Sequence, residues 1–161
     1  MKSARTMSAL IALLFLMACA QQAPTRTIAT TEQLMYGMVQ PVAEVVWDSV
    51  QTIVDREGVH ELQPQTEEEW EFVRNSALSL AESANLIMVM DRPLSEGTPE
   101  RREDWIDYAN GMIEGALEAA EAARVRSPEA LFTAGSNIYE NGCLACHEAY
   151  LPENALPNIG L

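Results

Sequence analysis

Four stretches of the chain carry apolar residues at helical spacing, and this periodicity limits the possible folds more than any other feature. Residues spaced three or four apart form one stripe along one face of an α-helix. Gly and Pro residues separate the stretches and read as turns. Four amphipathic helices with short loops predict an all-α fold, in the form of an antiparallel four-helix bundle.

The first predicted helix starts at Thr30 or Thr31 and runs to about Asp55. Pro41 lies inside it and should kink it, because its ring crowds the preceding turn. A loop is expected over residues 56–65, which contain Gly58 and Pro64. The stripe of this helix is formed by Met35, Val39, Val42, Val46, Val50 and Ile53.

The second predicted helix opens with a capping box, in which Glu69 follows Thr66 by three residues. It should stop before Pro93. The third is expected directly after Thr98-Pro99, a possible cap followed by proline at the first helical position. The stripes of these two helices are Trp70, Val73, Ala77, Leu80, Ala84 and Ile87, then Trp105, Ala109, Met112, Ala116, Ala119 and Ala123.

The fourth predicted helix starts at Ser127-Pro128, runs to about Tyr150 and stops before Pro152. No run of alternating β-branched residues is evident, so no strand is predicted. Composition agrees, because Ala, Glu and Leu are plentiful while aromatic residues make up only 6%. A hydrophobic content of 48% excludes wholesale disorder.

The N-terminus has the layout of an export signal: a basic start, an apolar run over 9–18, and then small residues. The run is too short to span a bilayer. It resembles the bacterial lipoprotein signal, in which cleavage precedes a cysteine, here Cys19, that is then lipidated. The alternative is an ordinary secretory signal. Residues 1–18 are therefore the predicted signal peptide, and Ala20, where Asp would resemble a retention signal, favours the outer membrane.

The chain is strongly acidic, with 24 Asp and Glu against 10 Lys and Arg. Removal of the signal peptide takes away Lys2 and Arg5, so that eight Arg remain and the formal charge becomes −16. This charge argues against nucleic acid and against docking on anionic lipid. The mature chain is divided into a tether over 19–29, the helical domain over 30–151 and a tail over 152–161.

Cys143-Leu-Ala-Cys146-His147 carries the strongest chemical information in the chain. It is the attachment pattern of haem c. On a helix the two thiols and the imidazole share one face, because their spacing is three and four. Cys143 and Cys146 can form thioethers with one haem, and His147 can bind its iron. Cys19 is assigned separately, which leaves these two cysteines as a pair.

Three other interpretations of the motif remain. A zinc site needs about four ligands, so His60 would have to join the three residues of the motif. A redox dithiol usually follows a strand in a βαβ unit, which is absent from the predicted elements. A disulfide across one helical turn suits disulfide geometry poorly. A structural or zinc-binding lipoprotein without haem is the corresponding alternative function.

A haem motif in the last of four helices resembles the class II cytochromes c, the cytochrome c′ family. The resemblance covers about residues 30–150 and rests on helix order, the stretch from Cys143 to Tyr150, and Trp105 near the start of the third helix. It implies that Trp105 packs against haem, and we add Tyr139 as a second packing residue. It also implies a possible homodimer. Leu151 departs from the family, many members of which carry Arg or Lys there.

The sixth iron ligand separates two functions within this family. The Leu34-Met35 pair is similar to the Met-ligated, low-spin branch, which makes Met35 the predicted distal ligand and Met38, one turn on, the second candidate. Such a protein is a one-electron carrier, not an enzyme, and its redox partners should present basic surface. Without a Met ligand the iron would be five-coordinate, and the protein would bind NO or CO.

Overall fold

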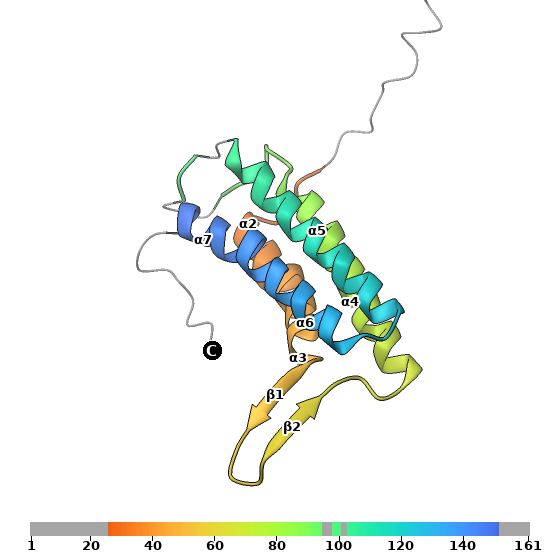
Figure 1. Cartoon of the computed structure of the whole chain (residues 1–161). Coiled ribbons are helices and arrows are strands. Elements are labelled where there is room, and N and C mark those ends of the chain that lie inside the picture. The colour runs from red at the N-terminus through yellow and green to blue at the C-terminus, as the bar shows by residue number, and fades with distance from the viewer. Residues whose placement is uncertain (1–25, 95–97, 101–102, 152–161) are drawn as a thin grey trace, which may run out of the picture.

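The computed structural model describes residues 26–94, 98–100 and 103–151, and it is mostly helical with two short strands (Figure 1). The predicted signal peptide, Cys19, most of the tether and the tail lie outside these residues. In chain order the elements are α2 (Thr31–Leu34), η1 (Met35–Val39), α3 (Gln40–Asp48), β1 (Gln51–Val54), β2 (Val59–Leu62), α4 (Glu67–Ile87), α5 (Asp104–Arg124), α6 (Pro128–Asn137), η2 (Ile138–Leu144) and α7 (Ala145–Tyr150).

The first helical segment, α2–η1–α3, begins at a capping box: the Thr30 hydroxyl accepts a hydrogen bond from the Gln33 N–H, and the Gln33 side chain accepts from the Thr30 N–H. Its middle, η1, is a π-helical turn, in which the Gln40 N–H bonds to the Met35 carbonyl. Pro41 has no N–H to continue an α-helical ladder. The irregularity therefore falls on the turn before the proline.

This segment ends at Asp48, so the prediction of a helix to Asp55 followed by a loop is wrong. The chain instead forms the antiparallel hairpin β1–β2, which projects from the helical body (Figure 1). Asp55 closes the turn, because its side chain accepts hydrogen bonds from the N–H groups of Glu57 and Gly58. Gly58 has φ +135°, a conformation that L side chains rarely adopt.

The predicted capping box of α4 is confirmed: Thr66 Oγ1 accepts from the Glu69 N–H at 3.2 Å, and Glu69 Oε2 accepts from the Thr66 N–H at 3.0 Å. The predicted start of the third helix is wrong, because residues 98–100 are not helical and α5 begins at Asp104. Part of the connection before it is held against the start of α2, where Pro93 accepts a backbone hydrogen bond from Thr31.

The last helical segment starts and ends where predicted, with Ser127 as its cap and Tyr150 as its last helical residue. Between α6 and α7 lies a second π-helical turn, η2. The stripes of the second and third predicted helices are buried in full, and α5 packs against α4 on one side and against α6 and η2 on another. Within the described ranges no helix is long and apolar enough to cross a membrane.

Candidate functional site

The Cys-x-x-Cys-His motif lies across the junction of η2 and α7. Cys143 belongs to the π-helical turn, whereas Cys146 and His147 belong to the α-helix that follows. Both cysteines are free thiols, partly buried, and both pack against the hydrophobic core. His147 is also partly exposed. The motif thus presents two thiols and one imidazole at the surface of the core.

Glycines hold η2 very close to α5. A Cβ added at Gly142 would lie 2.8 Å from the Cβ and 3.0 Å from the Cα of Met112. A Cβ at Gly115 would meet the backbone N of Ile138 at 2.8 Å, at the other end of η2. Side chains at these positions would force the two backbones apart. Because Gly142 and Gly115 have no side chains, η2, which carries Cys143, packs directly against the backbone of α5.

A polar and aromatic cluster fixes the far end of the motif. The Tyr150 hydroxyl donates a hydrogen bond to Asp104, and the Tyr150 ring packs edge-on against Trp105 with centroids 4.8 Å apart. The indole N–H of Trp105 donates to the Ile87 carbonyl at 3.1 Å. The start of α5, the end of α4 and the end of α7 are joined in this way. Sequence reasoning missed Asp104, since a lone acid at a helix start carries no sign of a long-range partner.

Burial dominates the electrostatics of the motif. It raises the pKa of Cys143 to about 12, with the neighbouring Cys146 as a second cause. It raises the pKa of Cys146 to about 11, and the carboxylate of Asp104 adds to this shift. Burial lowers the pKa of His147, because the charged imidazolium is poorly solvated there. At neutral pH the motif offers neutral thiols and a neutral imidazole with a free lone pair.

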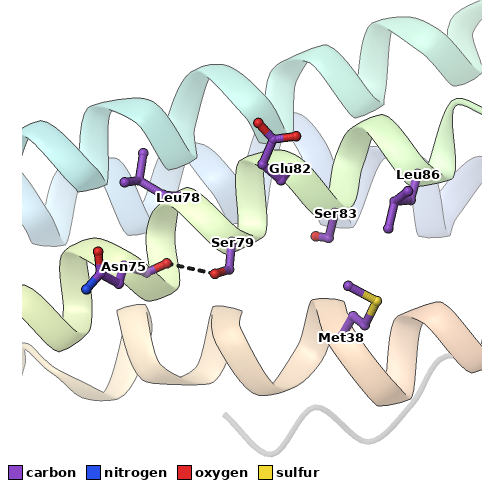
Figure 2. Close-up of a pocket in the computed structure, with 7 residues that line it drawn as sticks. All are labelled: Met38, Asn75, Leu78, Ser79, Glu82, Ser83 and Leu86. Atoms are coloured by element: carbon purple, nitrogen blue, oxygen red, sulfur yellow. Dashed lines mark hydrogen bonds between the residues drawn. The ribbon is translucent and has the colours of Figure 1, made fainter.

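The two candidate distal ligands lie in different surroundings. Met35 is partly buried and packs against the same core cluster as Cys143 and Cys146. Met38 is 44% exposed and lines a groove along α4, where it faces Ser83 and Leu86 (Figure 2). Of the two methionines, only Met35 therefore packs against the hydrophobic core that the cysteines of the motif also contact.

Met35 and the motif also belong to the same end of the molecule. The start of α2 is bonded to Pro93, just beyond α4, and Trp105 and Tyr150 tie the end of α4 to α5 and α7. Figure 1 shows α2 and α7 together at the end of the helical body opposite the hairpin. The structure thus brings the segments of the predicted axial ligands to one end.

Two other candidate residues lie elsewhere. His60 is on β2, where its ring bonds to Asp55 at 3.1 Å, and the hairpin is at the end opposite α7 (Figure 1). It is not placed to complete a zinc site with the motif. Tyr139 packs edge-on against Trp47, with ring centroids 6.2 Å apart. Trp105, by contrast, contacts Tyr150 at the end of the motif's helix.

Among the described residues, no group of three or more His, Cys, Asp and Glu side chains is arranged to hold a metal ion. The donors of the motif suit a prosthetic group that brings its own iron, since such a group needs only axial ligands and attachment points from the chain. The chain matches no family model, no curated protein and no solved structure in the comparisons.

Proposed function

We propose that this protein is an exported monohaem cytochrome of the class II kind that carries one electron at a time. In this proposal the four packed helical segments form an antiparallel four-helix bundle, with haem c attached at Cys143 and Cys146. His147 is the proximal ligand and Met35 the distal one. The chain is anchored through a lipid on Cys19 at the periplasmic side of a bacterial membrane, with the outer membrane preferred.

The main support for the proposal is that the motif has two free thiols and a neutral imidazole and is held in a fixed position. Cys143 and Cys146 are unpaired thiols within one turn of each other, and His147 follows with its imidazole kept neutral by burial. The close approach of Gly142 to Met112 and the bond from Tyr150 to Asp104 hold both sides of the motif. Two free thiols and one imidazole at this spacing are the groups that the attachment pattern of haem c requires.

The two π-helical turns add support. Within the ranges that the structure describes, they are η1, which begins at Met35, and η2, which contains Cys143. π-Helical turns are rare and occur frequently at functional sites. Here one begins at Met35, the proposed distal ligand, and the other contains Cys143 and leads directly into α7, which carries Cys146 and His147.

When bound, the haem supplies a reversible Fe(III)/Fe(II) couple. The chain's own residues set the conditions for it. Packing against the core partly shields Met35 and the two cysteines from solvent and limits their movement. The glycine contacts hold η2 in one position on α5. The acidic surface of the mature chain attracts redox partners with basic surface at low salt.

Covalent attachment is tested by the intact mass of the protein matured in a host that attaches haem c. The expected mass exceeds that of the processed chain by one haem, with any lipid on Cys19 counted separately, and the added haem is lost in the C143S/C146S variant. A mass without haem in the unchanged protein contradicts the proposal.

Distal ligation is tested by a matched pair, M35A and M38A. The M35A variant should change from a low-spin to a high-spin spectrum, whereas M38A should remain low-spin. Retention of the low-spin spectrum in M35A excludes Met35 as the ligand. A high-spin spectrum in the unchanged protein that responds to CO or NO indicates the gas-binding alternative.

A further inference from the structure

The hairpin β1–β2 makes its pairing contacts within itself and projects away from the helical body (Figure 1). Apolar side chains on it face solvent: Val54 is 75% exposed and Val59 65%. Two strands alone are marginally stable, and an uncovered strand edge is a template for pairing with another strand. The hairpin is thus an incomplete sheet.

The register shows which backbone groups point outward. Asp55 and Gly58 exchange both backbone hydrogen bonds, at 2.9 and 3.3 Å. Bonded and non-bonded pairs alternate along an antiparallel ladder, so the next bonded pair is Ile53 with His60. On β1, Thr52 and Val54 therefore direct their N–H and C=O groups away from β2. No other described residue bonds to these groups.

The outer edge of β1 lacks the features that normally prevent pairing. The strand Gln-Thr-Ile-Val contains no charge and no proline, although the chain has a net charge of −14. The outer edge of β2 instead carries Glu61, so two copies joined there would bring carboxylates together. A second acidic chain can approach β1 without this repulsion.

We propose that β1 pairs with β1 of a second copy of this chain. The two strands are antiparallel and related by a twofold axis at Ile53. Thr52 therefore lies opposite the partner's Val54, and Val54 lies opposite the partner's Thr52. These pairs use every outward backbone group of β1 in both copies, and each forms both hydrogen bonds of a bonded pair. The two Ile53 side chains meet at the axis as a close, apolar, non-bonded pair.

Charge at the ends of the strands fits this pairing. Arg56, at the tip of the hairpin, forms no ion pair in the part of the chain that the structure describes. Antiparallel pairing brings each tip to the base of the other hairpin, which follows Asp48. The pairing thus brings Arg56 towards the partner's Asp48, a residue of opposite charge. The resulting four-stranded sheet is independent of haem binding.

Disulfide trapping in the full-length, exported protein tests the pairing. In the I53C variant the two cysteines are a non-bonded cross-strand pair, whose Cα separation of about 4.5 Å lies within the disulfide range. We expect a dimer on non-reducing gels that disappears with reductant. The matched control is V59C, on β2. The native Val59 side chain is more exposed than that of Ile53, yet V59C should give at least about tenfold less dimer than I53C.

A second pair of variants tests the backbone bonds. Proline at position 54 removes an outward N–H and leaves the bonds to β2 intact. I53C/V54P should therefore lose the cross-linked dimer, whereas I53C/V59P, altered on the outer edge of β2, should keep it. Absence of dimer in I53C, equal dimer in V59C, or full cross-linking in I53C/V54P each overturns the inference. Circular dichroism confirms folding of each variant.

Discussion

Replacement of Gly142 by alanine should destabilise the protein, because Gly142 lies where the backbone of η2 closely approaches α5. The added methyl group would stand 2.8 Å from the Cβ of Met112 and 3.0 Å from its Cα and N. Two of these three atoms are backbone atoms inside a long helix, so a rotamer change cannot relieve the contact. One of the two segments has to move.

Overpacking of this kind costs about 1–3 kcal/mol. Alanine is intrinsically better than glycine in a helix by about 1 kcal/mol, which offsets part of the cost. The net loss of unfolding free energy in G142A should be about 0–2 kcal/mol, with a central value of about 1 kcal/mol. For a domain of this size a loss of about 1 kcal/mol corresponds to a fall in Tm of roughly 3–5 °C.

The matched control is Gly37, in η1, where an added Cβ meets nothing within 4 Å. G37A should leave the Tm unchanged or raise it by an amount equivalent to up to about 1 kcal/mol. Thermal unfolding followed by far-UV circular dichroism measures both variants against the unchanged protein. A G142A protein as stable as the original, or a G37A protein that loses as much stability as G142A, refutes the reasoning.

Four further outcomes are expected. R126G should raise the unfolding free energy by about 0.5–1 kcal/mol, because Arg126, two residues after the end of α5, has φ 57° and its ion pair with Glu67 is exposed. T66A should lower it by about 1 kcal/mol through loss of the α4 cap. Backbone hydrogen bonds lower the pKa of Glu69 below 4.5, so the stability it contributes is present above that pH and is lost as the pH falls through the lowered value. E69Q should therefore lose less stability than the unchanged protein on acidification. Electron-transfer rates with a basic redox protein should fall as ionic strength rises.

Chemical denaturation measures the first two variants, and a pH series of the same experiment measures E69Q. A lower stability of R126G would mean that the ion pair outweighs the backbone strain. An unchanged T66A protein would show that the cap contributes little. If the unfolding free energies of E69Q and of the unchanged protein fall in parallel as the pH is lowered, ionisation of Glu69 does not contribute to stability. Stopped-flow mixing reports the rates, and a flat or rising dependence on salt contradicts electrostatic steering.

Local features were predictable from the sequence, because the residues that cause them are neighbours. The Thr66–Glu69 box and the Ser127 cap each satisfy backbone groups within one turn, and both helices begin where expected. The start predicted at Thr98-Pro99 was wrong because α5 begins at Asp104, after Glu103, whose side chain makes no capping hydrogen bond, so that no cap signal in the sequence marks this start. The hairpin was missed because a short apolar run that includes Val50 and Ile53 fits a strand as well as a helix.

The same distinction applies to the site. The motif from Cys143 to His147 is contiguous, so its chemistry could be read directly from residue types and spacing. The bond between Tyr150 and Asp104 and the contact of Gly142 with Met112 depend on which helix faces meet. Single-sequence patterns do not specify that choice. The π-helical turns were likewise unpredicted, since apolar periodicity assumes a regular helix.

The central claim is that this chain holds one haem with His147 and Met35 as axial ligands. The most direct measurement is the optical absorption spectrum of the protein matured in a host that attaches haem c. The account predicts a low-spin spectrum with the charge-transfer band of a methionine–iron bond in the oxidised form. A spectrum without haem bands, or a high-spin spectrum that changes with CO or NO, contradicts it.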